Sequence, residues 1–134
     1  MTKLVDVEGI GPTYAGKLIE AGIKDMEALL EKGSTPEGRR EIEEKSGIGH
    51  KVILEWVNHV DLFRIKGVAS EYSDLLEEAG VDTVPELAQR VAANLYEKMS
   101  QVNVEKKLVR RLPTQKQVAD WIDQAKKLPR IIKY

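Results

Sequence analysis

Apolar residues recur along this chain with the period of an α-helix. Tyr14, Leu18 and Ala21 are three and four residues apart, so one face of the segment around them is apolar. The same spacing returns in later segments, and we find no alternating run typical of a strand. The pattern therefore predicts an all-α protein.

The opening motif of the chain returns near its middle. Residues 9–29 (GIGPTYAGKLIEAGIKDMEAL) and residues 67–87 (GVASEYSDLLEEAGVDTVPEL) are identical at seven of 21 positions. Each copy has a glycine-containing turn, a helix with an apolar face, and then a second glycine. We interpret each copy as two helices joined by a tight turn.

A second motif lies between these copies and also repeats. Residues 46–57 (SGIGHKVILEWV) match residues 111–122 (RLPTQKQVADWI), which pairs Trp56 with Trp121. The glycines of the first copy are replaced by Leu-Pro-Thr in the second. Because the two tryptophans recur at helical spacing, we expect them in the core.

The four motifs predict four helix–hairpin–helix units in two similar halves. The first double unit is residues 1–61, and the second, which is basic toward its C-terminus, is residues 62–134. A half of about 60 residues buries only a marginal core by itself. We therefore expect the two halves to pack as one compact unit.

The ends of the predicted helices carry recognisable signals. Glycine suits the left-handed residue that ends a helix, and Ser or Thr three residues before Glu or Gln suits the start. Expected helix ends are Gly22 and Gly80, and expected starts are Thr35–Pro36, Thr83 with Glu86, Asn94 with Glu97, and Thr114 with Gln117.

Two Gly–Ile–Gly turns are the first candidate site. Gly9-Ile10-Gly11 and Gly47-Ile48-Gly49 each open a helix, whose N-terminal N–H groups can hold a phosphate. The alternative is a tight turn whose isoleucine only fills the core. We expect Gly11 and Gly49 to need a backbone angle that a β-branched residue resists.

The charge around these two turns differs. Asp6 and Glu8 precede the first turn and would repel a phosphate, although Lys17 follows closely. His50 and Lys51 follow the second turn, which makes phosphate binding there easier to accept.

A basic segment near the C-terminus is the second candidate site. The chain has a net charge of −1, but residues 98–134 hold ten Lys and Arg against three Asp and Glu. The spacing of Lys106, Lys107, Arg110 and Arg111 predicts that part of them share one helix face. This surface either contacts phosphates or is merely solvated; its residues are Lys106, Lys107, Arg110, Arg111 and Lys116.

Composition argues against several other classes of protein. The absence of cysteine excludes disulfides and thiolate metal sites and fits a cytoplasmic protein. No apolar run is long enough to span a membrane. His50 and His59 have no ligand-spaced partner, so we expect no metal and no cofactor. No nucleophile or paired-carboxylate arrangement suggests an enzyme.

These motifs resemble a known family. The segments GVASEYSDLLEEAGVDTVPELAQR and LVRRLPTQKQVADWIDQAKKLP, with the Gly–Ile–Gly turns, closely resemble domain of unknown function 4332 over nearly the whole chain. The resemblance implies a compact tandem helix–hairpin–helix fold, of the SAM-like or DNA-polymerase-β N-terminal-like kind. It implies no established activity.

The wider helix–hairpin–helix superfamily commonly binds duplex DNA without sequence preference, through hairpin backbone amides. Two hairpins of this chain depart from that pattern, because Ala69 replaces a glycine in the third and the fourth lacks both. Carried over by position, the resemblance implicates Gly9, Ile10, Gly11, Gly47, Ile48 and Gly49.

Two functions of different classes remain open. The first is non-catalytic, sequence-independent binding of double-stranded DNA through the hairpins and the basic C-terminal segment. The alternative is a helical protein–protein interaction or scaffold module that binds no nucleic acid. The net charge of −1 and the acids beside the first turn favour the alternative.

Overall fold

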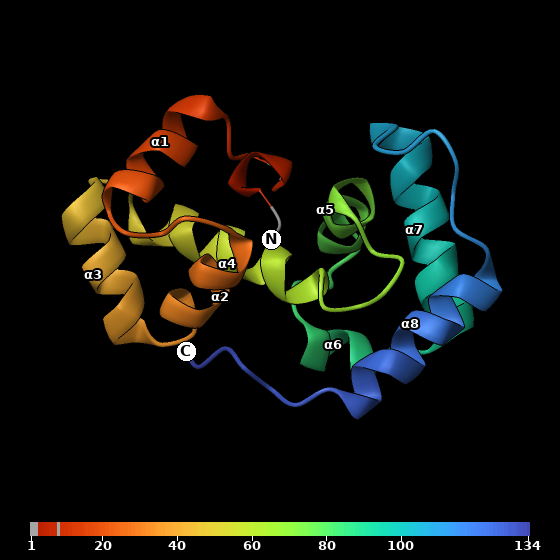
Figure 1. Ribbon diagram of the computed structural model, residues 1–134. Helices are drawn as coiled ribbons and strands as arrows, with labels where there is room; N and C mark the ends of the chain where they lie inside the picture. Colours follow the sequence, from red (N-terminus) through yellow and green to blue (C-terminus); the bar gives the residue numbers. More distant parts are fainter. Residues whose placement is uncertain (1–2, 8) are drawn as a thin grey trace. The chain divides into compact units, whose positions relative to one another are not determined.

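The computed structural model describes residues 3–7 and 9–134 of the chain. Within them the chain forms one short 3-10 helix and eight α-helices, and no strand, which confirms the all-α prediction. The elements in chain order are η1 (Leu4–Asp6), α1 (Pro12–Glu20), α2 (Met26–Gly33), α3 (Pro36–Ser46), α4 (His50–Leu62), α5 (Ser70–Glu78), α6 (Val84–Ala88), α7 (Ala92–Lys106) and α8 (Gln115–Lys127) (Figure 1).

The chain divides into two compact units. Unit 1 consists of Met1–Asp61 together with Ile131–Tyr134, and unit 2 consists of Leu62–Arg130. The sequence assigned residues 131–134 to the second half, whereas the structure has them in unit 1. The reason is local, because the Lys133 N–H donates to the Ser34 carbonyl between α2 and α3 (2.7 Å). In Figure 1 the blue C-terminal segment ends beside this junction.

The helices of the two units correspond in order, and two of the four pairs also correspond in length. Helices α1 and α5 both have nine residues, and α4 and α8 both have 13 residues. Their first residues are also matched in the repeats, Pro12 with Ser70 and His50 with Gln115. The predicted left-handed residues are confirmed, with φ of 93° at Gly22 and 94° at Gly80. The repeated motifs thus fold into the same local structures.

Most of the predicted helix starts are also confirmed. Thr35 and Thr114 are N-caps whose hydroxyls accept backbone N–H groups, and Thr114 forms a full capping box with Gln117. Thr83 caps α6 in the same way. The prediction for Asn94 is wrong, because α7 begins at Ala92, after Val91.

Each unit has its own buried apolar residues. In unit 1 they include Leu18, Leu29, Ile42, Ile53 and Trp56, each at most 3% exposed. In unit 2 one continuous core joins all four helices and the segment before them; its largest fully buried members are Leu62, Ile65, Leu75, Leu76, Leu87, Leu95 and Met99.

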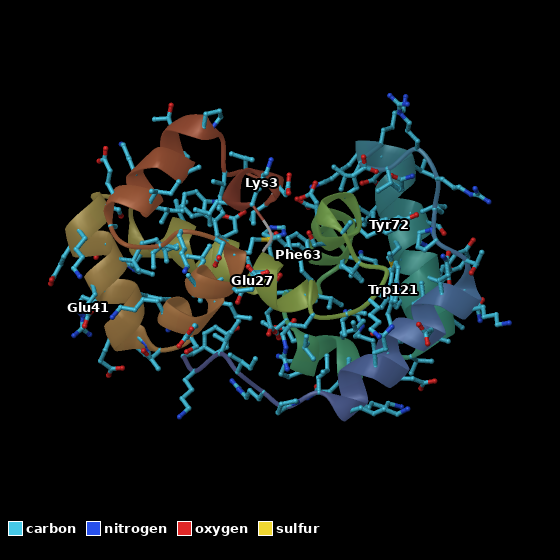
Figure 2. The ribbon with its side chains drawn as sticks, in the orientation of Figure 1. Lys3, Glu27, Glu41, Phe63, Tyr72 and Trp121 are labelled. Atoms are coloured by element: carbon cyan, nitrogen blue, oxygen red, sulfur yellow. The ribbon has the colours of Figure 1, made fainter. Side chains whose placement is uncertain are left out.

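The repeated tryptophans lie in these cores, as their spacing predicted. Trp56 and Trp121 are 3% and 2% exposed. Each ring contacts the tyrosine of the matching motif, with centroids 5.2 Å apart for Tyr14–Trp56 and 5.4 Å for Tyr72–Trp121. The labels in Figure 2 mark the second pair, which joins α5 to α8.

Candidate nucleic-acid interface

The first turn, residues 9–11, is held between a buried side chain and a tryptophan. Ile10 is 3% exposed, and its N–H donates to the Val7 carbonyl (3.0 Å). Gly9 has a φ of 91°, and a Cβ at this position would lie 3.2 Å from Nε1 of Trp56. Glycine is therefore needed at residue 9 both for the backbone angle and for the close approach of the indole.

The expectation that the second glycine of each pair needs a special backbone angle is wrong. Gly11 is extended, with φ −89° and ψ −178°, and Gly49 is also outside the left-handed region. The left-handed residues are Gly9 and Gly47, because the chain turns earlier than expected. Ala69 in the third turn, with φ −109° and ψ −175°, has nearly the same conformation as Gly11.

The third turn, residues 67–69, therefore keeps the backbone of the first. Gly67 has a φ of 99°, and a Cβ there would lie 3.0 Å from Nε1 of Trp121. Val68 is buried, and its N–H donates to the Ile65 carbonyl (3.1 Å). Replacing the second glycine by Ala69 leaves this geometry unchanged.

The helices that follow these two turns start without a side-chain cap. Neither Gly11 at α1 nor Ala69 at α5 supplies one. Pro12 has no N–H to satisfy, which suits the first position of α1. Both N-termini thus keep backbone donors that no N-cap side chain occupies.

The second turn, residues 47–49, is closed by a carboxylate. The His50 N–H at the start of α4 donates to Oε2 of Glu43 (2.8 Å), and Nδ1 of His50 lies 3.4 Å from the same oxygen. The N–H of the buried Ile48 donates to the Ser46 hydroxyl (3.1 Å). Lys51, the second residue of α4, is exposed. A phosphate at this N-terminus would have to displace Glu43, so the structure weakens the sequence argument for this turn.

The fourth connection, residues 107–114, is longer and differently built. Helix α7 ends at Lys106, and Lys107 takes a left-handed conformation with φ 50°. The side-chain amide of Asn103 forms two hydrogen bonds with the backbone of Val109. It accepts the Val109 N–H (3.0 Å) and donates to the Val109 carbonyl (3.1 Å). Val109 and Pro113 are buried. We call residues 107–114 the connector.

Further contacts fix the far end of the connector. The Tyr72 hydroxyl donates to the Arg111 carbonyl (3.1 Å). The Thr114 hydroxyl accepts the Gln117 N–H (3.1 Å), and the Gln117 side chain accepts the Thr114 N–H (2.8 Å). The backbone on both sides of Arg110 and Arg111 is therefore held in place.

The predicted cations are exposed, but they do not share one helix face. Arg110 and Arg111 lie in the non-helical connector, because α7 has already ended. In the described part of the chain, four of the five make no ion pair. We call these four the basic surface: Lys107, Arg110, Arg111 and Lys116.

Lys106 differs from the other cations. Its Nζ is paired with a carboxylate oxygen of Glu78, at the end of α5. The hydrogen bond from this pair, and then the charge of Glu78, raise the pKa of Lys106 above its usual value. An anionic ligand would have to compete with Glu78 for this lysine.

Sequence reasoning missed a charge difference between the first and third turns. The similarity between the two copies extends toward the N-terminus as far as Leu4 and Leu62. The Val7 N–H donates to the Leu4 carbonyl, and in the same way the Ile65 N–H donates to the Leu62 carbonyl. In that alignment Asp6 corresponds to Arg64. Extending the comparison of the two copies to the residues before each glycine would have found this signal.

The next pair in the extended alignment is also reversed in charge. Glu8, which lies outside the described residues, corresponds to Lys66. Lys66 has an exposed side chain, and its N–H and carbonyl are both bonded to the amide of Gln124 (2.8 and 3.1 Å). Basic residues thus precede the third turn where acids precede the first.

The predicted site residues fall into two groups. Each group is assembled within its own unit. Unit 1 holds Gly9, Ile10, Gly11, Gly47, Ile48, Gly49 and Lys51, and unit 2 holds Lys106, Lys107, Arg110, Arg111 and Lys116.

The described helices are all too short or too polar to cross a bilayer.

Comparison with known proteins assigns the chain to one family. No curated protein and no solved structure is significantly similar to the chain. The family model described as domain of unknown function (DUF4332) matches residues 8–128, which is most of the chain. The protein therefore belongs to the DUF4332 family.

Proposed function

We propose that the chain is a non-catalytic, cytoplasmic protein that binds double-stranded DNA without sequence preference. The observation that carries this proposal is the basic surface of unit 2, three of whose four cations lie on a connector whose backbone is fixed. Lysine and arginine bind phosphate oxygens through charge and directed N–H donors. Phosphate contacts carry no base information, so binding of this kind is independent of sequence.

The architecture of the connector supports this role. Val109 and Pro113 are buried, while Lys107, Arg110 and Arg111 are exposed between and beside them. Because Asn103 and Tyr72 hold the connector backbone, less conformational entropy is lost on binding than for a mobile loop. Lys116, on the first turn of α8, adds a fourth cation.

We further propose that the two units are tandem helix–hairpin–helix pairs. The matching φ values of Gly9 and Gly67, and the uncapped starts of α1 and α5, support this assignment. Of these two turns, the third is the better phosphate contact, because Arg64 and Lys66 precede it.

The alternative function is a protein–protein interaction module. It is favoured by unit 1, where Glu43 occupies the N-terminus of α4 and Asp6 precedes the first turn. The net charge of −1 also favours it. On this alternative, the basic surface is a solvated face.

A salt titration with duplex DNA decides between them. We would measure fluorescence anisotropy with two unrelated duplexes between 50 and 200 mM salt, as is usual for such titrations. Four phosphate contacts give a log–log slope of about −3.6, so affinity should fall by about a hundredfold over this range. The two duplexes should bind equally.

Two charge-matched variants locate the interface. Reversing Lys107, Arg110, Arg111 and Lys116 to Glu should reduce affinity at low salt by at least about tenfold. Reversing four exposed cations of unit 1 to Glu changes the net charge equally and should have a much smaller effect; these are Lys3, Lys24, Arg40 and Lys45. No binding by the parent chain at about 100 μM would rule out the DNA proposal and favour the alternative.

A further inference from the structure

The segment Ile131–Tyr134, which we call the tail, binds to unit 1 as an extended strand would. The Lys133 N–H donates to the Ser34 carbonyl (2.7 Å), and Nη2 of Arg39 donates to the Lys133 carbonyl (2.9 Å). Both backbone groups of one residue are thus bonded to unit 1. Ile132, the preceding residue, is 2% exposed.

Arg39 forms the fixed part of this site. It is 7% exposed, and its Nη1 donates to the Gly33 carbonyl at the end of α2 (2.7 Å). One side of the guanidinium is therefore anchored within unit 1, and the other side is aimed at the tail. Arginine stays charged even when burial lowers its pKa, as here.

The tyrosine of the tail adds a side-chain contact. The Tyr134 hydroxyl donates to Oδ1 of Asn58 on α4 (3.0 Å), and the guanidinium of Arg39 lies 6.0 Å from the centre of the Tyr134 ring. The Lys133 side chain is exposed. The contacts of the tail therefore consist of one buried aliphatic side chain, one peptide group and a tyrosine hydroxyl.

The tail belongs to unit 1 but follows the whole of unit 2 in the sequence. Pro129 belongs to unit 2, where its carbonyl accepts from Nη2 of Arg64 (2.7 Å), and Leu128 packs against the unit 2 core. The change from one unit to the other takes place between Arg130 and Ile131. A terminal segment that is separated along the chain from the rest of its unit is the kind of element that domain-swapped dimers exchange.

We propose that unit 1 carries a binding site for an extended aliphatic-x-Tyr segment, and that a second copy of this chain can supply this segment from its own tail. The tail of the same chain has an effective concentration in the millimolar range, as short linkers give. The unmodified chain therefore keeps its own tail bound at ordinary concentrations. Binding of the tail to a second copy has to be tested in variants that have lost this contact within one chain, which we call the cis contact.

Two full-length variants separate the site from the tail. Ile132→Asp leaves Arg39 and Ser34 in place and spoils the tail. Arg39→Ala spoils the site and keeps the tail. Each variant alone should sediment as a monomer, whereas an equimolar mixture should form a one-to-one heterodimer.

Matched controls accompany the mixture. Arg40 is the exposed neighbour of Arg39, so Arg40→Ala should keep the cis contact and give no heterodimer with Ile132→Asp. Adding Ile132→Asp to the Arg39→Ala chain should abolish the heterodimer. Circular dichroism establishes that each variant is folded.

A peptide of residues 128–134 tests the site directly and does not depend on the folding of the Arg39 variant. Labelled peptide should bind the Ile132→Asp chain saturably in fluorescence anisotropy and should not bind the parent chain at the same concentration. Changing the isoleucine at 132 to aspartate in the peptide should weaken binding at least about tenfold, because the site buries that side chain.

The outcomes are decisive. Peptide binding together with the heterodimer supports the proposal. Peptide binding without the heterodimer overturns the second copy as the supplier of the segment. Absence of both overturns the site itself, and neither result bears on the binding of DNA.

Discussion

The first and third turns have the same backbone and opposite surroundings. Gly9 and Gly67 are both left-handed, and each faces the indole of a buried tryptophan. Yet Asp6 precedes the first turn at the position where Arg64 precedes the third. The comparison teaches that close packing fixes a few residues of each unit, whereas the charge around them varies.

The second turn and the connector differ in a related way. Glu43 and Asn103 both lie shortly before the left-handed residue that ends their helix, and both accept or donate through their side chains to the chain that follows. Glu43 closes a short turn with a negative charge. Asn103 instead holds the longer connector and leaves its cations exposed.

The largest effect should come from removing a repeated tryptophan. Trp56→Ala and Trp121→Ala each delete a buried ring that contacts a tyrosine and a glycine, and each should cost about 3–5 kcal/mol of unfolding free energy. Urea unfolding followed by circular dichroism measures this. Val104→Ala, at a residue that is 77% exposed, should change stability by less than about 0.5 kcal/mol. Equal costs for all three would refute the assignment of the rings to the cores.

Substituting the left-handed glycines should have the next largest effect. Gly9→Ala and Gly67→Ala place a Cβ 3.2 and 3.0 Å from an indole nitrogen, at a positive φ, and should each cost about 1–3 kcal/mol. The matched substitution Gly11→Ala puts alanine where unit 2 already has Ala69, so it should be nearly neutral. A Gly11→Ala variant less stable than Gly9→Ala would contradict this account.

Removing the side chains of Asn103 and Glu43 should lower the unfolding free energy by smaller amounts. Asn103→Ala removes two hydrogen bonds to Val109 and should cost about 2 kcal/mol, at about 1 kcal/mol for each bond. Glu43→Ala removes an exposed cap and should cost about 0.5–1 kcal/mol. The midpoints of urea unfolding compare them. Reversal of this order would show that the connector does not depend on Asn103.

The smallest effect on stability should come from Glu78→Gln. This change removes the partner of Lys106, so the pKa of Lys106 should fall toward its ordinary value, which NMR titration can follow. The raised pKa means that the pair stabilises the fold at neutral pH and that this contribution is lost as pH rises past the pKa of Lys106. If the DNA proposal holds, the freed lysine should steepen the salt slope by about 0.9. An unchanged pKa would show that the pair does not persist in solution.

The sequence predicted what local periodicity and capping encode. Helix spacing predicted the all-α fold and the buried tryptophans, and glycine and threonine marked helix ends at Gly22, Gly80, Thr35 and Thr114. It could not assign the positive φ to Gly9 instead of Gly11, because both residues lie in the same turn and only the packed indole distinguishes them.

Other features of the candidate site depend on contacts between distant residues. Glu43 reaches His50 across the second turn, and Lys106 meets Glu78 from another helix, so neither pairing follows from helical spacing. The basic residues are exposed, but the expectation that part of them share one helix face was wrong because α7 ends at Lys106. No sequence pattern indicated that Arg39 holds residues 131–134, because its partner Lys133 is 94 residues away.

The tail also constrains the order in which the chain can finish folding during synthesis. Residues 1–61 of unit 1 leave the ribosome before unit 2 does, but Lys133 is made only after the whole of unit 2. At about 5–20 residues per second, this delay is on the order of ten seconds. During that time, residues 1–61 fold with Nη2 of Arg39 lacking the Lys133 carbonyl. Completion of unit 1 therefore waits for synthesis of unit 2, and a ribosome that stalls within unit 2 leaves both units unfinished.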